Sequence, residues 1–485
     1  QGWMILILGW VFVPFYTRSM VYTMPEFLER RYNPQSRTIL SVISLVSYVL
    51  TKVAVTVYAG GLVFQQVFGI KELWGIDFFW IAAIGLVVLT ALYTIFGGMK
   101  SVLYTSVLQT PILLLGSLII LVLGFKELGG WDEMMRVCGA VTVNDYGDTM
   151  TNLIRSNDDA NFPWLGALIG SAIIGFWYWC TDQFIVQRVL SGKNEMEARR
   201  GTIFGAYLKL LPVFLFLIPG MIAFALHQKY IGAGGEGFLP MLENGTANAD
   251  AAFPTLVAKL LPAGVKGLVV CGILAALMSS LASLFNSSAM LFTIDFYKRF
   301  RPQTSEKKLV GIGQVATVVI VILGILWIPI MRSVGDVLYT YLQDVQSVLA
   351  PGIAAAFLLG ICWKRTSAQG GMWGLISGMV IGLTRLGAKV YYSNAGEVAD
   401  STFKYLFYDM NWLFFCGWMF LFCIIVVIVV SLATEAPTAE KIQGLVFGTA
   451  TKEQKASTRA SWNHWDIIHT VIILAITGAF YWNFW

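Results

Sequence analysis

Charged residues are too scarce in this sequence to cover the surface of a soluble protein. Asp, Glu, Lys and Arg make up 13% of its 485 residues, against 57% for the hydrophobic types. Because a soluble chain of this length needs far more surface charge, the excess apolar side chains are expected to face lipid. Apolar runs of about 20 residues, each long enough to cross a hydrocarbon core of about 30 Å, recur along the chain. The sequence therefore predicts an all-α polytopic membrane protein, with the lipid bilayer as its partner.

Histidine and cysteine are also rare, and catalytic motifs are missing. The chain has three His and six Cys, and no Walker-type phosphate loop, zinc-binding His pair or Ser/His/Asp arrangement. Only Cys138 lies in a long loop, so no disulfide framework is expected. These absences argue against a primary pump and leave gradient-driven transport, a channel or a membrane-embedded enzyme. The Lys and Arg behind the net charge of +5 form no patch, which argues against nucleic acid as a partner.

About twelve membrane spans are predicted where apolar runs alternate with loop residues. They lie near residues 1–17, 38–68, 75–96, 103–124, 163–187, 201–227, 265–293, 308–332, 345–363, 370–389, 410–433 and 465–485. The chain opens at Gln1 directly into the first of these runs, with no basic segment ahead of it, which is unlike a signal peptide. This start is typical of a helix entered partway, so upstream helices are expected ahead of Gln1.

Positive charge falls in alternate loops. About 20 of the 33 Lys and Arg lie on one side, which the positive-inside rule assigns to the cytoplasm. They are Arg18, Arg30, Arg31, Arg37, Lys100, Arg188, Lys193, Arg199, Arg200, Lys298, Arg299, Arg301, Lys307, Lys308, Lys364, Arg365, Lys441, Lys452, Lys455 and Arg459. The long loops at 126–162 and 228–264 then lie outside. The expected location is the plasma (inner) membrane, and nothing indicates an oligomeric state.

One predicted span carries a strip of small and hydroxyl side chains. Ala276, Ser279, Ser280, Ser283 and Ser287 follow helical steps of three and four, so they share one face. Hydroxyls and backbone carbonyls are suitable ligands for Na⁺, but small residues in this pattern also let two helices approach closely. The pattern alone leaves both interpretations open.

Polar groups occur in four other apolar segments, and polar groups in lipid tend to mark cavities or pathways. Lys209 can snorkel to the cytoplasmic face, donate to a substrate hydroxyl or pair with a carboxylate in a central cavity. The aromatic run at 176–179 can stack on a sugar ring or pack between helices, and the nearby Asp182 can pair with Arg188 at the rim. The segment at 341–344, ahead of Pro351, suits either a kinked helix or an outer loop. Lys52 has no assigned role beyond snorkelling or a buried pair.

Longer motifs make the sequence recognisable. They are YTMPEFL at 22–28, WYWCTDQ at 177–183, QR at 187–188, LKL at 208–210, FNS at 285–287 and AAAFLL at 354–359. In this order and spacing the chain resembles the solute:sodium symporter family, in particular its sodium/glucose and sodium/myo-inositol cotransporter branch. The resemblance covers the chain from its first residues to its last helix.

The resemblance implies the LeuT-type fold of five-plus-five inverted repeats with peripheral helices. The first core helix and the start of the second are then expected to be missing from this chain. Residues 1–124 form the partial first repeat and 125–162 an extracytoplasmic loop. Residues 163–363 form the second repeat, including the extracytoplasmic loop at 228–264, and 364–485 the peripheral helices.

The resemblance also assigns roles to individual residues. Na⁺ would be bound by the carbonyl of Ala276 and the hydroxyls of Ser279 and Ser280. Lys209 and Gln343 would hydrogen-bond a sugar or polyol, while Tyr178 closes the site toward the cytoplasm and Trp179 lines its wall.

Two positions depart from the family pattern. Gly175 stands where family sugar carriers have Asn or Thr, which leaves the substrate open. Ser106 stands where many members have an Asp that forms a second sodium site with a serine matching Ser283. Since a lone hydroxyl compensates the desolvation of a cation poorly, a vestigial second site and one Na⁺ per substrate are expected.

The expected function is therefore Na⁺-coupled symport of a glucose- or galactose-like sugar or a polyol by alternating access, without enzymatic activity. The alternative is the same scaffold carrying sialic acid, proline or pantothenate. A channel would need a continuous polar pore, and no predicted span has the repeated polar face to line one. A membrane enzyme would need acid, base or metal-binding groups that converge inside the spans, and such groups are scarce.

Overall fold

The computed structural model describes residues 2–19, 21, 23–242, 245–334, 337–395 and 399–483, with the backbone alone at 93, 95–103, 105, 108, 332–334 and 483. The regular structure of the described residues is helical, apart from a short hairpin of strands β1 (Glu72–Leu73) and β2 (Ile76–Asp77). Several long helices contain a short π-helical segment, labelled η below.

The N-terminal helices are α1 (Gly2–Ile7), η1 (Leu8–Phe12), α2 (Val13–Ser19), α3 (Met24–Arg31), α4 (Pro34–Ser47), η2 (Tyr48–Val53), α5 (Ala54–Phe68), α6 (Phe78–Leu128), α7 (Trp131–Gly139), α8 (Trp164–Phe176), η3 (Trp177–Thr181), α9 (Gln183–Leu190), α10 (Glu195–Pro212), η4 (Val213–Leu217) and α11 (Ile218–Gly232). The C-terminal helices are the 3₁₀ turn η5 (Ala249–Ala251), α12 (Ala252–Leu260), α13 (Ala263–Met290), η6 (Leu291–Tyr297), α14 (Lys298–Phe300), α15 (Glu306–Val334), α16 (Leu338–Cys362), α17 (Ala368–Asn394), α18 (Thr402–Lys404), η7 (Tyr405–Asp409), α19 (Trp412–Ala433), α20 (Ala439–Ile442), α21 (Lys452–Ala460) and α22 (His464–Asn483).

Helix starts follow from local sequence signals. The side chain of Thr23 accepts a hydrogen bond from the Glu26 backbone N–H and begins α3, with Pro25 in its first turn. Asn33 begins α4 in the same way ahead of Pro34. Asp182 caps α9 and so ends the aromatic segment η3.

Nine helices of the described residues are long and apolar enough to cross a membrane. A tenth follows if Gly2–Ser19 and Met24–Arg31, which meet at 73°, are counted as one broken span. Two further predicted spans, 75–96 and 370–389, are absent from this set. The first corresponds to a shorter apolar helix, Phe78–Leu92, and the second to α17, which carries Arg385 and Lys389 and is less apolar.

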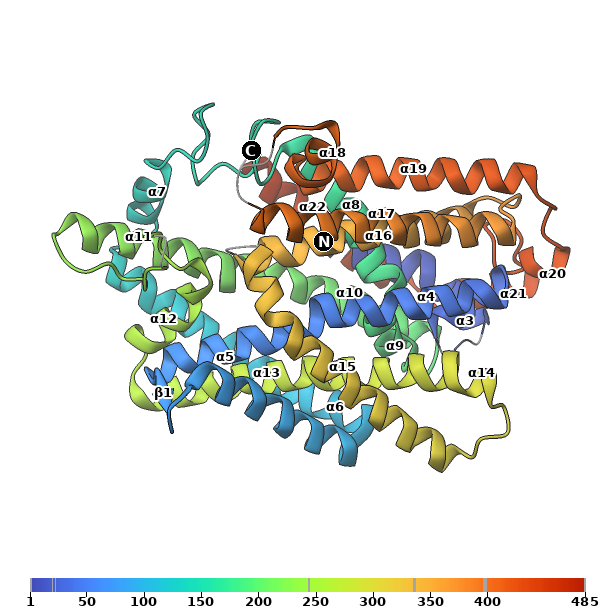
Figure 1. Cartoon of the computed structure of the whole chain (residues 1–485), viewed down its shortest axis with the longest axis horizontal. Coiled ribbons are helices and arrows are strands. Elements are labelled where there is room, and N and C mark those ends of the chain that lie inside the picture. The colour runs from blue at the N-terminus through green and yellow to red at the C-terminus, as the bar shows by residue number, and fades with distance from the viewer. Residues whose placement is uncertain are drawn as a thin grey trace.

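Helix α6 joins the predicted spans 75–96 and 103–124 into one element of 51 residues. It begins beside the β1–β2 hairpin and ends before α7, and both lie at the same end of the molecule in Figure 1. At 1.5 Å per residue a straight helix of this length would extend about 76 Å, so α6 doubles back within its length. Both predicted spans are helical, whereas the helical connection between them was not predicted.

The ends of the molecule differ in character. Figure 1 shows α7, α11, α12 and the hairpin at one end of the long helices, and α3, α14, α20 and α21 at the other. The first end carries the predicted outer loops and the second carries basic loop residues such as Lys298 and Lys441. This arrangement agrees with the predicted alternation of the loops; Lys100 has no described side chain.

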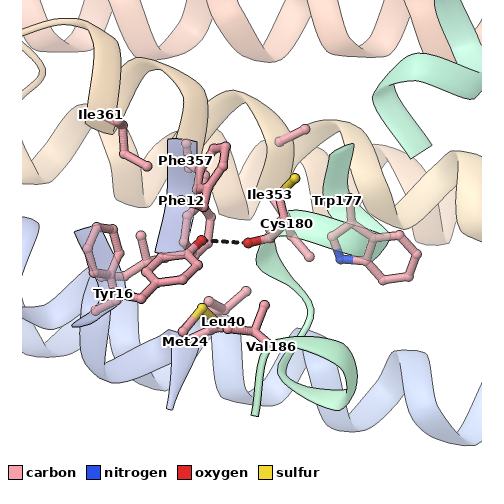
Figure 2. Packing of buried hydrophobic residues seen from close by; sticks show 14 of the residues in the cluster. Phe12, Tyr16, Met24, Leu40, Trp177, Cys180, Val186, Ile353, Phe357 and Ile361 are labelled. Carbon is pink, nitrogen blue, oxygen red and sulfur yellow. Dashed lines mark hydrogen bonds between the residues drawn. The ribbon is translucent and has the colours of Figure 1, made fainter. Parts of the chain in front are cut away.

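A buried cluster fixes the aromatic segment η3. Phe12 and Tyr16 from the N-terminal helices pack with Trp177 and Cys180 of η3 and with Phe357 of α16 (Figure 2). The Tyr16 hydroxyl donates to the Cys180 carbonyl oxygen at 2.5 Å. Because the last carbonyls of a helix have no partner within it, this bond stabilises the end of η3.

Candidate functional site

Trp179 contacts two of the other predicted substrate-binding residues, Tyr178 and Lys209. Its ring is 5.1 Å from that of Tyr178, edge to face, and the Nζ of Lys209 on α10 lies 5.4 Å from its centroid. The indole Nε1 is buried and has no acceptor among the described residues. Lys209 likewise forms no ion pair with any residue that the structure describes. Two hydrogen-bond donors therefore lie beside an aromatic face.

Gly175 lies where helix α8 comes close to helix α1. It is buried on α8, one turn before Trp179. A Cβ built on it would lie 3.2 Å from the Cγ of Met4 on α1. A larger side chain at this position would therefore push against Met4, and the glycine allows α1 and α8 to approach.

Gln343 lies on α16, which packs against α8 and η3. Its side chain is buried and forms a hydrogen bond with Tyr339. No described contact joins it to Lys209 or Trp179. Its segment, 341–344, is helical and continuous through Pro351, so the outer-loop interpretation is wrong.

The neighbouring Asp344 forms an ionic cluster that the sequence did not reveal. Lys389 pairs with one of its oxygens, and Arg385 Nη2 lies 3.6 Å from the other. Both cations belong to α17, and Arg385 is fully buried. The cluster ties α17 to the part of α16 that carries Gln343.

The serine face of α13 turns toward α6 and α9 rather than toward lipid. The Ser279 hydroxyl is buried and lies 2.5 Å from the hydroxyl of Ser106 on α6. Ser280 and Ala276 are half-buried. The structure thus brings Ser106 to Ser279, which was predicted as a ligand of the main sodium site.

Ser283 has a different neighbour from the one expected. Its hydroxyl accepts a hydrogen bond from Arg188 and donates to the Ser279 carbonyl oxygen at 3.0 Å. Gln187 donates to the Ser283 carbonyl oxygen at 3.3 Å. A guanidinium therefore contacts the serine that was predicted to form a vestigial second site with Ser106.

A buried ion pair between Lys52 and Asp182 lies at the C-terminal end of the aromatic segment η3. The two side chains are only 9% and 3% exposed, and the Tyr48 hydroxyl donates to the same carboxylate at 2.9 Å. The Lys52 Nζ also lies 5.2 Å from the centroid of the Tyr178 ring. The sequence left open a pair of Asp182 with Arg188 at the rim; the ion pair that the structure gives Asp182 is with Lys52, and Arg188 contacts Ser283. The sequence did show Lys52 inside an apolar run, and a buried ion pair was one of the two roles considered for it.

A second buried carboxylate lies nearer the basic end. Asp295 of η6 is fully buried, accepts a hydrogen bond from the Thr23 hydroxyl at 2.9 Å and pairs with Arg37 at 2.6 Å. Gln183 accepts a hydrogen bond from the Met24 backbone N–H at 2.8 Å. These contacts join α3, α4, α9 and η6, and Arg37 was predicted only as a loop charge.

The described residues offer hydroxyls, amides and cations rather than the ligands of a transition metal. No group of three or more His, Cys, Asp or Glu that could hold a metal ion occurs among them. Hydroxyl and carbonyl oxygens are hard ligands, which suit hard cations rather than soft transition metals. Two cavities, of about 670 and 350 Å³, lie away from these residues, one beside α15 and one between α10 and α22.

Among solved structures, one of a substrate-bound, outward-open Na⁺-coupled sialic acid symporter has a similar fold. The TM-score is 0.68 with 20% sequence identity, over 90% of this chain and 83% of that one. The fold is therefore that of a mostly helical membrane protein with many spans.

Curated relatives are much closer in sequence. The sodium/mannose cotransporter SLC5A10 of Bos taurus is 36% identical over 99% of this chain and 83% of its own length. The Homo sapiens sodium/myo-inositol cotransporter 2 is 36% identical, over 92% of this chain and 67% of that protein. The Ovis aries sodium/glucose cotransporter 1 is 38% identical, over 89% and 67%. A model of the Sodium:solute symporter family matches residues 2–378. The chain belongs to the sodium:solute symporter family and is a multi-pass integral membrane protein.

Proposed function

We propose that this protein couples the entry of Na⁺ to the uptake of a sugar or related polyol across the plasma membrane. Family membership makes it a transporter and not an enzyme. The relatives named above are cotransporters of mannose, myo-inositol and glucose with sodium. These three solutes share many hydroxyls on a compact ring, which defines the substrate class proposed.

The observation that carries the proposal is the position of Lys209. A cation inside a span normally pairs with a carboxylate, because burial of an unpaired charge is costly. Here the ammonium lies over Trp179 and pairs with no described carboxylate. A sugar presents both an apolar ring face for the indole and hydroxyls for Lys209 and the Trp179 Nε1. Gln343, Tyr178 and Gly175 complete the proposed site.

The proposed sodium ligands are the Ala276 carbonyl and the Ser279 and Ser280 hydroxyls on α13. The buried position of Ser279 and the half-buried position of Ser280 support this assignment. Three neutral oxygens compensate the desolvation of Na⁺ without holding it as strongly as several carboxylates would.

One Na⁺ per substrate is proposed. Ser106 offers no carboxylate, and the guanidinium at Ser283 repels a second cation there. A ratio of charge to sugar flux close to one is expected from the reconstituted protein. A ratio of two would contradict a single sodium site.

The proposed architecture is the LeuT-type five-plus-five inverted repeat, with the first repeat in 1–124, the second in 163–363 and peripheral helices in 364–485. In this arrangement α13 and η3 contribute to one central site. Binding of Na⁺ orders the cavity for the sugar, and the loaded protein then opens to the cytoplasm.

The proposal is tested by uptake into proteoliposomes under an imposed sodium gradient. Labelled glucose, mannose and myo-inositol are compared with sialic acid, proline and pantothenate. Uptake of a sugar or polyol in Na⁺ but not in K⁺ is expected. Sodium-dependent uptake of only the other solutes would retain the family and refute the substrate class.

A further inference from the structure

An apolar groove of about 670 Å³ follows the outside of α15. One wall is formed by α15 itself, at residues such as Val315 and Val319. The other wall comes from α4 and η2, with Leu45 and Val49, and Phe292 of η6 also lines the groove. Its lining is almost entirely carbon, so water is a poor occupant.

The groove has the dimensions of a lipid tail. Its residues on α15 run from Lys308 to Leu323, which corresponds to about 22 Å along a helix. Val315, Val319 and Leu323 are 64%, 50% and 48% exposed. A single extended acyl chain reaching from the membrane surface to the bilayer centre would cover these side chains.

One end of the groove is positively charged. Lys308 lines it and forms no ion pair with a described residue. The segment 296–308 contains five basic residues (Lys298, Arg299, Arg301, Lys307 and Lys308) and one acidic residue, Glu306. This end lies on the side that the positive-inside rule assigns to the cytoplasm, where anionic lipid head groups are concentrated.

We propose that the groove is a specific site for an anionic phospholipid of the cytoplasmic leaflet. One acyl chain lies between α15 and the α4–η2 helix, and the phosphate accepts a hydrogen bond from the Lys308 ammonium. Charge complementarity selects the head group and the apolar walls select the chain. This site is independent of the proposed sugar and sodium sites, since none of their residues lines it.

Four variants separate a defined site from a diffuse surface charge. Lys308→Gln removes the cation in the groove, whereas Lys307→Gln removes the adjacent exposed lysine, which does not line it. Gly311→Leu fills the groove, because a Cβ on Gly311 would meet nothing within 4 Å. Gly267→Leu is the matched control, since Gly267 is an exposed helical glycine of α13 with the same open surroundings.

The experiment titrates the purified, delipidated protein with phosphatidylglycerol or with phosphatidylcholine of identical acyl chains. Bound lipid is counted by native mass spectrometry, which also reports the oligomeric state. One phosphatidylglycerol per chain is expected, bound about fivefold more weakly by Lys308→Gln. Gly311→Leu should weaken it by about tenfold or more. The two controls should stay within about twofold of the unchanged protein.

Three results would overturn the proposal. Equal binding of both lipids would mean that charge does not select the occupant. Equal losses in Lys307→Gln and Lys308→Gln would indicate diffuse attraction to a basic surface. A dimer that Gly311→Leu converts to monomer without loss of lipid would make the groove a protein interface.

Discussion

At the scale of single residues, Lys209 is the side chain whose change should most affect the substrate. Lys209→Ala removes a charged hydrogen-bond donor, which is worth about 1.5–3 kcal/mol. Sugar affinity should therefore fall about 10- to 100-fold, with normal expression and folding. Equilibrium binding of the labelled sugar measures this, with Lys193→Ala as the control because Lys193 is exposed in a loop. Loss of folding, with no effect on affinity in the folded fraction, would favour a structural role for Lys209.

The Lys52–Asp182 pair should matter for stability. Removal of one partner of a buried pair leaves an uncompensated charge, which typically costs about 3–5 kcal/mol. Lys52→Met should therefore lower the melting temperature strongly. The double variant Lys52→Met/Asp182→Asn should lower it less, because Asn still caps α9 and carries no charge. Equal losses in the single and double variants would mean that the pair does not act as a unit.

These residues also mark the limit of sequence-based prediction. The position of Lys52 in an apolar run indicated a buried pair or snorkelling, but its partner lies 130 residues away. Asp182 had a nearer basic candidate in Arg188, which the fold instead directs to Ser283. Partners separated this widely depend on how helices pack, and local pattern carries no information about that.

At the scale of elements, the start of α16 depends on a loop. Val337 has no capping side chain, and the Leu338 backbone N–H instead donates to the carboxylate of Asp250, at 3.0 and 3.2 Å. Burial raises the pKa of the Asp250 carboxyl, and the hydrogen bond from Leu338 opposes this only in part. The outer loop at 228–264 therefore holds the helix that carries Gln343.

Because the pKa of Asp250 is raised in the folded protein, the stability of the protein should depend on pH in a defined direction. The folded protein retains the Asp250 proton at pH values where the unfolded chain has lost it, so this contribution to stability is complete below the unfolded pKa of about 3.9. It is lost as the pH rises through the folded-state pKa. Asp250→Asn should flatten this part of the melting-temperature profile and keep the acceptor for Leu338. An unchanged profile in the variant would exclude Asp250 as its source.

Other features of the elements were predictable to different degrees. Most of the membrane-crossing helices could be located from the length of the apolar runs, because the bilayer thickness sets that length. The helix at 341–344 could not be separated from a loop by hydropathy, since Gln343 and Asp344 are polar. In the folded protein Gln343 bonds to Tyr339 and Asp344 pairs with the cations of α17, so the polar side chains are compatible with a buried helix.

At the scale of the whole molecule, the proposed mechanism couples two sites on different helices. The serine face lies on α13, and the proposed sugar-binding residues lie on η3, α10 and α16. Thermodynamic linkage requires that if Na⁺ tightens sugar binding, the sugar tightens Na⁺ binding by the same factor. The family could be recognised from motifs spread along the chain, whereas the distance between the two sites depends on tertiary structure.

Equilibrium sugar affinity measured across a range of Na⁺ concentrations tests this claim most directly. We expect the sugar affinity to rise with Na⁺ concentration, with a log–log slope no greater than one, and then to saturate. In Ser280→Ala the rise should shift to higher Na⁺ or disappear, while Lys209→Ala lowers affinity at every Na⁺ concentration. A sugar affinity that does not depend on Na⁺, or an unchanged dependence in Ser280→Ala, would contradict the account.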